Sequence, residues 1–408
     1  MPSTPVDAHF DLTDPDLLAD HLPLDEFAWL RRNQPVRWNP QTSTGSDYGD
    51  GGFWALTRHA DVSAVTRSPG WSVEAKSAFA RRLDASDPTG ESSKNLLLCM
   101  DPPRHTRVRS VGNRCFTPRA LAGLEDDLRE QARRIVWAAK REGTGDFVID
   151  VARHLPLQAI AGLMGIPDAD QQQFFHWSDQ MAGSEDPEYA SDLSGTIEMF
   201  VYAHAAAEAR VEVDFGDVTS RLVRPDAKGE RLTSEEFGFF FMILAVAGNE
   251  TTRQAITHGM LAFLEHPDQW DRWRSERPST AVDEILRWAS PAVVLQRTAI
   301  EDTEVAGRPV RQGERVGLYF ASANFDEEVF DDPRQFDIGR SHNPHVTFGA
   351  GGSHYCLGAN LSRLELKVMF DVLAEELGDV TLMGPPGRLR SSWLNGIKHL
   401  PVDYGGSR

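Results

Sequence analysis

The clearest pattern of hydrophobic and polar positions predicts a long helix near the middle of the chain. Thr233 and Glu236 have the spacing of a capping box, which marks where a helix begins. The apolar run that follows, Phe237 to Ala247, has no polar face, as is typical of a buried central helix. We expect the helix to end at Glu265, because a proline two residues later disfavours helix in the residue before it.

The remaining pattern predicts a mainly α chain with minor β structure. Helical spacing dominates from Leu121 to about Leu264, and a further long helix is expected after Cys356. A shorter helix is expected from Ser279 or Thr280 to Ser290, and short strands are expected at 51–57, 293–298 and 315–320. We interpret residues 1–408 as one domain, with a strand-rich part at about 1–95 and a helical part at about 96–408.

Composition and charge exclude several classes of protein. Hydrophobic residues make up 40% and charged residues 25%, as in an ordinary globular protein. A formal net charge of −19 would repel phosphate, so nucleic acid is not an expected partner. The sequence has neither a signal peptide pattern nor an apolar run long enough for a bilayer, so we expect a cytoplasmic protein without a membrane anchor.

One basic stretch departs from this acidic background. No acidic residue occurs between Asp101 and Glu125, and the stretch contains Arg104, Arg107, Arg109, Arg114 and Arg119. A solvated helix face would explain such a pattern. We favour a local surface that binds anions, because the rest of the chain is acidic.

A glycine-rich loop with one cysteine is the first candidate for chemistry. The segment FGAGGSHYCLG, Phe348 to Gly358, places Cys356 just before a predicted helix. Glycines let the backbone approach a flat ligand closely, and the amides of a helix N-terminus stabilise a thiolate. A thiolate in this position can bind iron. The alternative is a cysteine that packs as a small hydrophobic residue, which the surrounding glycines disfavour.

The long helix contains the second candidate, the segment AGNETT from Ala247 to Thr252. Gly248 costs about 1 kcal/mol in a helix interior, which indicates the close approach of a cofactor. A hydroxyl that donates to a carbonyl one turn earlier can open the helix and leave a groove for a small ligand such as dioxygen. Glu250 and Thr251 then supply an acid and a proton relay. The alternative, a surface turn of the helix, fits poorly with the apolar run before it.

The pair Glu284 and Arg287 alone would indicate only an exposed ion pair. Together with the cysteine loop and the segment AGNETT, this pair resembles the motifs of the cytochrome P-450 superfamily. The resemblance runs from about Asn95 to Tyr404. It implies a triangular, mainly helical fold with haem b between the long central helix and the helix after Cys356. It also implies that Glu284 and Arg287 form a buried structural network with Arg340.

The resemblance assigns roles around the haem. Cys356 is the iron ligand, and Glu250 and Thr251 are the catalytic pair. The residues expected to contact the haem are His105, Arg109, Ala247, Arg297, His354 and Cys356. Thiolate ligation favours cleavage of the O–O bond, so the implied activity is that of a monooxygenase.

The resemblance also implies electron donors. Electrons would come from NAD(P)H through a ferredoxin reductase and a ferredoxin. Arg104, Arg107 and Arg114 could face the acidic ferredoxin. One departure is the position of Phe348, eight residues before Cys356 where the commonest bacterial pattern has seven. Actinobacterial steroid and lipid hydroxylases share the longer loop.

Further segments, above all RLRSSWLNGIKHLPVDY near the C-terminus, resemble actinobacterial enzymes that hydroxylate the end of a cholesterol side chain. The implied substrate is an apolar steroid, and the expected pocket residues are Val246, Ala247, Val293, Val294, Leu295, Trp393 and Leu394. Two alternatives stay open for the same chain. One is a tailoring hydroxylase of a terpenoid or polyketide, and the other is a haem sensor without catalysis.

Overall fold

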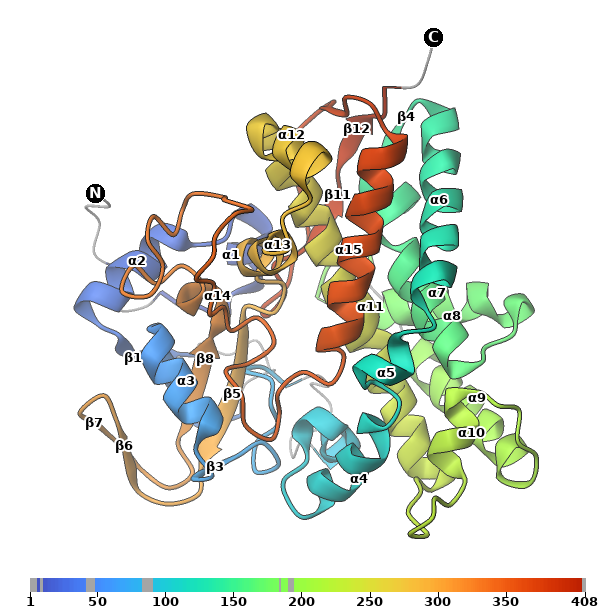
Figure 1. Ribbon diagram of the computed structural model, residues 1–408. Coiled ribbons are helices and arrows are strands. Elements are labelled where there is room, and N and C mark those ends of the chain that lie inside the picture. The colour runs from blue at the N-terminus through green and yellow to red at the C-terminus, as the bar shows by residue number, and fades with distance from the viewer. Residues whose placement is uncertain are drawn as a thin grey trace.

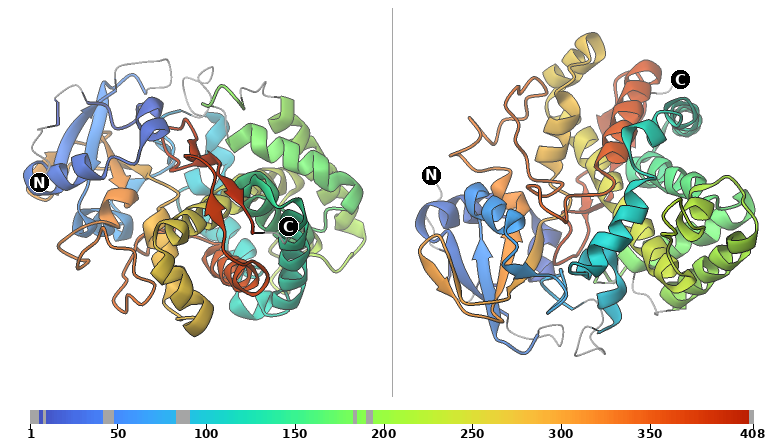
Figure 2. Two further views of the ribbon diagram at one scale, coloured as in Figure 1. Left: turned by 90° about the horizontal axis from the view of Figure 1, so that it is seen from above. Right: turned by 60° about the horizontal axis from the view of Figure 1, so that its bottom comes forward.

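A computed structural model describes residues 6–7, 10–41, 48–82, 91–182, 185–189 and 194–405 of the chain. Figure 1 shows the strands β1, β3, β5 and β8 of the main sheet on one side of the molecule and most helices on the other, with the long helices α11 and α15 between them. The two views of Figure 2 show the same separation. The chain is therefore mainly α with minor β structure, as the sequence predicts.

The helices are bounded as follows. They are α1 (Pro15–Asp20), α2 (Leu24–Asn33), α3 (His59–Arg67), α4 (Arg104–Asn113), α5 (Pro118–Leu121), α6 (Glu125–Glu142), α7 (His154–Met164), α8 (Asp168–Ala182), α9 (Ser194–Glu212), α10 (Val218–Val223), α11 (Ser234–Glu265), α12 (Pro267–Glu276), α13 (Ala281–Ala289), α14 (Phe320–Ala323) and α15 (Ala359–Glu376). Short 3₁₀ helices η1 (Glu91–Asn95) and η2 (Leu97–Cys99) and the π-helix η3 (Val148–Ala152) complete the set.

Five strands form the main sheet, in the order β1-β2-β8-β5-β3. Its strands are β1 (Val36–Pro40), β2 (Gly52–Leu56), β3 (Trp71–Ser72), β5 (Val294–Ala299) and β8 (Arg315–Tyr319). Only the β2–β8 pair is parallel, with Leu56 opposite Leu318. The smaller sheets use β4 (Thr144–Asp146), β6 (Thr303–Val305), β7 (Arg308–Val310), β9 (Thr381–Leu382), β10 (Gly387–Arg388), β11 (Ile397–His399) and β12 (Pro401–Asp403).

The bounds of α11 confirm the prediction made from its polar signals. Thr233 is the N-cap: its hydroxyl accepts from the amide of Glu236 at 3.1 Å, and the Glu236 carboxylate accepts from the amide of Thr233 at 3.0 Å. These two bonds satisfy amides that the helix itself leaves without acceptors. The helix ends at Glu265, and the next residue caps it through a bond from His266 N to the carbonyl of Ala262.

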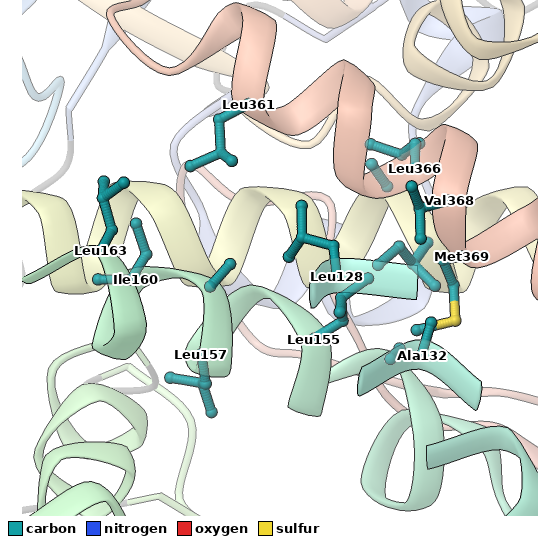
Figure 3. Packing of buried hydrophobic residues seen from close by; sticks show 14 of the residues in the cluster. Leu128, Ala132, Leu155, Leu157, Ile160, Leu163, Leu361, Leu366, Val368 and Met369 are labelled. Atoms are coloured by element: carbon teal, nitrogen blue, oxygen red, sulfur yellow. The ribbon is translucent and has the colours of Figure 1, made fainter. Parts of the chain in front are cut away.

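Helix α11 packs against α7, α9, α13 and α15. At Gly259 a Cβ atom would lie 2.6 Å from the Phe370 ring and 2.8 Å from Ile285, so only glycine allows α13 and α15 to approach this closely. Figure 3 shows how side chains of α6, α7 and α15 interdigitate in the same core, among them Leu128, Leu155 and Met369. This packing fixes the position of α15 relative to α11.

In the part of the chain that the structure describes, no helix has both the length and the apolar character that crossing a bilayer requires.

Candidate active site

One cavity lies between α11, strand β5 and the loop that leads into α15. Most of the residues that the sequence singled out line it together, although they come from distant parts of the chain. These are His105, Arg109, Val246, Ala247, Thr251, Leu295, Arg297, His354, Cys356 and Trp393. The fold therefore brings the cysteine loop, the middle of the long helix and the basic stretch to a single site.

The loop from Phe348 to Gly358 presents Cys356 to this cavity. The amide of Cys356 donates to the carbonyl of Phe348 at 2.9 Å, which closes the loop. Gly352 has φ = 78°, and a Cβ atom there would lie 2.5 Å from the carbonyl oxygen of Thr66, so the turn requires glycine. Removal from bulk water raises the pKa of the Cys356 thiol, while the amide of Gly358 and the guanidinium of Arg109 act in the opposite direction. These groups would stabilise the thiolate form.

Two histidines and two arginines meet on the same wall of the cavity. The rings of His105 and His354 lie with centroids 4.1 Å apart. Both ring nitrogens of His105 are buried and have no hydrogen-bond partner among the described residues. Burial, together with the nearby charge of Arg109, lowers the pKa of His105 to about 4. Burial also lowers the pKa of Arg297 to about 10. Donors that are buried without acceptors are costly, so this wall fits a ligand that carries carboxylates.

The cavity also has the features that a flat, iron-containing ligand requires. A thiolate-forming cysteine projects from one side, and the small residues Ala247 and Gly248 of α11 line the other. At Gly248 a Cβ atom would lie 2.9 Å from Ile160, which also lines the cavity, so glycine lets α11 and α7 approach closely here. The residues present therefore fit haem b, with Cys356 at the iron and His105, Arg109, Arg297 and His354 toward its carboxylates.

Thr251 and Thr252 line the cavity one turn after Ala247. The hydroxyl of Thr251 donates to the carbonyl of Ala247 at 2.7 Å, as the sequence predicts for a hydroxyl that bonds back along the helix. The hydroxyl of Thr252 donates to that of Ser362 on α15 at 3.3 Å. A short series of hydroxyl groups thus runs from α11 to α15 beside the cavity.

The structure places Glu250 outside the cavity lining. Its side chain is fully buried, forms an ion pair with Arg253 and accepts from Gln254 at 2.7 Å. The physical reason is the helical period: residues 247, 248, 251 and 252 share one face, and residue 250 is turned about 100° away from its neighbour Thr251. In this arrangement Glu250 does not contact a ligand in the cavity.

Three predicted pocket residues are core residues instead. Val293, Val294 and Leu394 are at most 2% exposed and lie outside the cavity lining. On strand β5 side chains alternate between faces, so Leu295 points into the cavity while Val294 packs with the Phe27 cluster on the opposite face. Leu394 is next to Trp393, is fully buried and forms an isolated bridge with Ala292.

Sequence reasoning missed several apolar lining residues. Those on α11, such as Phe240, Ile243 and Leu244, share the helical spacing of Ala247, so this signal was available. Others come from segments without such a signal, namely Phe79, Leu97, Leu98, Phe116, Ile160, Pro291 and Ala292. Their approach depends on the tertiary fold.

Glu284 and Arg287 of α13 form a buried cluster with Arg340. Arg287 binds both carboxylate oxygens of Glu284 at 2.8 Å, and both side chains are 0% exposed. Arg340 donates to Glu284 Oε2 at 3.1 Å. Arg287 also donates to the carbonyls of Asn324 and Pro333, so this buried cluster fixes the long segment before the cysteine loop.

Three other arginines of the basic stretch have partners within the chain, while Arg119 is exposed. Arg107 pairs with Glu236 at the start of α11, and Arg114 pairs with Asp226 at 2.7 Å. Arg104 donates to the side chain of Asn95. The stretch therefore divides between the cavity wall and ion-paired positions at the surface, where the side chains of Arg107 and Arg114 stay 39% and 36% exposed.

Comparisons with known proteins agree on one family. Its model, described as Cytochrome P-450, matches residues 188–375. A steroid C26-monooxygenase of Rhodococcus jostii is 48% identical over 97% of this chain and 84% of the relative. A methyl-branched lipid omega-hydroxylase of Mycobacterium tuberculosis is 42% identical over 93% of this chain and 90% of the relative. A solved cytochrome P-450 of Mycobacterium marinum in complex with pseudoionone has a TM-score of 0.91 and 34% identity, and the match covers 98% of this chain and 99% of that one.

Proposed function

Since this chain belongs to the cytochrome P-450 family and is a monooxygenase, we propose that it hydroxylates the terminal carbon of the branched side chain of a steroid. The names of the relatives support this substrate class, because both describe oxidation at the far end of an apolar chain. In the reaction one atom of O2 enters a C–H bond and the other leaves as water, with two electrons and two protons consumed.

The observation that carries the proposal is the apolar wall of the cavity. Beyond the groups assigned to the haem, the wall is formed by side chains such as Phe79, Leu98, Val246, Leu295 and Trp393. Burial of apolar substrate surface against such a wall contributes about 25 cal/mol of binding free energy per Å². The shape of the wall, rather than polar contacts, orients the substrate. Terminal methyl groups have the strongest C–H bonds of an alkyl chain, so their oxidation requires a narrow site that keeps weaker bonds away.

The haem is held by residues already described. Cys356 would bind its iron, and His105, Arg109, Arg297 and His354 would bind its carboxylates. When bound, haem with a thiolate ligand supplies the activation of O2. Buried guanidinium groups would stabilise the haem carboxylates through charge-assisted hydrogen bonds.

The protons come through groups of this chain. Thr251 lines the cavity and can pass a proton from its hydroxyl, while Glu250 is buried one helical step away. We therefore assign Thr251 to proton transfer and Glu250 to the support of this turn of α11 through Arg253 and Gln254. The electrons come from NAD(P)H through a ferredoxin reductase and a ferredoxin.

Spectral titration of the ferric protein followed by product analysis tests the proposal. The probes are a cholestenone, a methyl-branched fatty acid and a panel of macrolides. We expect the cholestenone to shift the iron from low to high spin at micromolar concentration and to yield a terminal alcohol. Tight binding of a macrolide without any response to the steroid would instead support a tailoring hydroxylase. Reduction by ferredoxin without turnover of any probe would support a haem sensor.

A further inference from the structure

The turn at residues 390–395, here called the C-terminal turn, carries Trp393 into the cavity. On one side the turn is fixed to the segment that follows α13. The carbonyl of Trp393 accepts from the amide of Val293 at 2.7 Å, and the amide of Asn395 donates to the carbonyl of Pro291 at 2.8 Å. Pro291 also lines the cavity, so this side of the turn belongs to the cavity wall.

Two adjacent carboxylates hold the other side of the C-terminal turn. Asp186 accepts from the amide of Arg390 at 2.9 Å. Glu185 accepts from both the amide and the hydroxyl of Ser392, at 2.6 and 2.9 Å, through the same oxygen. The two carboxylates thus accept from the amides of residues 390 and 392, in the way that the carbonyls of a neighbouring strand would. Hydrogen bonds to a carboxylate are roughly twice as strong as those between neutral groups.

Glu185 differs from its acidic neighbours in its partners. Asp186 and Glu188 both bind Lys398, at 3.0 and 2.8 Å, so they are chiefly ion-paired. The Glu185 carboxylate forms an ion pair with Arg81 only at 3.8 Å, and Arg390 donates to the Glu185 backbone carbonyl rather than to its carboxylate. The main interaction of the Glu185 carboxylate is therefore with Ser392, directly before Trp393.

Trp393 is held against the cavity by this arrangement. Its ring meets that of Phe79 edge to face, with centroids 5.5 Å apart, and both rings line the cavity. The Phe79 contact restrains the ring, while Ser392 restrains the backbone from which the ring projects. Displacement of a positioned group by 1 Å can change a rate by about 10²-fold.

We propose that Glu185 is a positioning residue that determines which carbon of the substrate is oxidised, through its hold on Ser392 and Trp393. The inference rests on the proposed function, because it concerns the placement of a side chain with a terminal methyl group. Beside that methyl lies a methine carbon whose C–H bond is weaker. If the Trp393 side chain moves away from the cavity, the methine carbon can occupy the reacting position. It is then oxidised in preference because its C–H bond is weaker.

The test compares Glu185→Ala with Glu185→Gln and with the control Glu212→Gln, which changes an exposed carboxylate at the end of α9. Hydrogen exchange of the haem-loaded protein measures the Ser392 amide directly, without turnover. We expect exchange in Glu185→Ala to be about tenfold faster, in keeping with the loss of one hydrogen bond. Glu185→Gln keeps an oxygen that can accept but loses the charge, so its exchange should lie between that of the parent and that of Glu185→Ala. The exchange of the control should match that of the parent.

Product analysis supplies the second measurement. We expect Glu185→Ala to increase the ratio of tertiary to terminal alcohol by at least about threefold, with a smaller increase in Glu185→Gln. Unchanged Ser392 exchange in Glu185→Ala would overturn the positioning role. Faster exchange with an unchanged product ratio would overturn the role in specificity. If the parent oxidises a probe other than the steroid, the proposed function fails, and the ratio of products from that probe decides the role of Glu185.

Discussion

At the scale of single residues, the hydroxyl of Thr251 is already used within α11, where it donates to the carbonyl of Ala247. We expect Thr251→Ala to consume reductant while forming less alcohol and more hydrogen peroxide. Positioned proton transfer typically contributes about 10²- to 10⁴-fold, so alcohol formed per reductant should fall at least about tenfold. The measurement is alcohol and peroxide formed per NAD(P)H, and Thr251→Ser should retain most of the coupling. Normal coupling in Thr251→Ala would shift the role to Thr252.

Glu365 of α15 is a buried acid beside the same cavity. It is 1% exposed, and its Oε1 has no hydrogen-bond partner in the described part of the chain. Burial raises the pKa of Glu365 from 4.5 to about 8. The folded protein therefore keeps a proton that the unfolded chain releases, so the Glu365 contribution lowers the free energy of unfolding as pH rises between these two values.

Glu365→Gln should remove this dependence. We expect the difference in unfolding free energy, variant minus parent, to be more positive at pH 8 than at pH 5, as measured by urea unfolding. The exposed control Glu212→Gln should give the same difference at both pH values. A pH-independent difference for Glu365→Gln would mean that the folded protein does not hold this proton.

Individual residues show both the reach and the limit of sequence reasoning. Cys356 and Thr251 could be singled out because their local motifs carry chemistry, and the structure places both at the cavity. The burial of Glu250 outside the cavity lining could not be read from its motif, because a motif names neighbours along the chain, whereas a helix turns successive side chains about 100° apart. The carboxylate of Glu185 could not have been found, since its partner Ser392 is distant in sequence and hydrogen bonds through its backbone.

At the scale of elements, α11 was predictable because its signals are local. The capping box and the proline after its end act within a few residues, and the observed bounds agree with them. Strand β5 was also expected, but which of its side chains face the cavity was not. That choice depends on which face of the sheet the helices cover, so Leu295 and Val294 could not be distinguished from their own sequence.

The cluster on α13 gives a prediction at this scale. Removal of one partner of a buried ion pair leaves an uncompensated charge and typically costs about 3–5 kcal/mol. We therefore expect Arg287→Ala to lower the free energy of unfolding by about this amount, because Arg287 and Glu284 are both fully buried. Arg340→Ala should cost less, since its side chain is 10% exposed and Arg287 continues to neutralise Glu284.

Denaturant unfolding of the two variants checks this order. Arg134→Ala is a suitable control, because Arg134 forms an exposed pair with Glu130 within α6. Such pairs contribute about 0.2–1 kcal/mol. Equal losses for Arg287→Ala and Arg134→Ala would contradict the structural role of the cluster.

At the scale of the whole molecule, the cavity exists only because four distant parts of the chain meet. The basic stretch, α11, the cysteine loop and the C-terminal turn each line part of it. Sequence motifs indicated the first three, and resemblance indicated the fourth. Their contacts with Phe79, Leu98 and Ile160 follow from tertiary packing, which a single sequence does not encode in any local pattern.

The parallel pairing of β2 with β8 has a consequence for how the protein is made. Leu56 pairs with Leu318, so the partner strand is synthesised long after the hairpin of β1 and β2. At about 5–20 residues per second, the hairpin emerges from the ribosome more than about ten seconds before β8 does. During that interval one hairpin edge has no native partner, and unpaired strand edges invite association between chains. We therefore expect ribosome-associated chaperones to bind the nascent N-terminal hairpin. The yield of folded protein should be limited by this interval rather than by the stability of the finished fold.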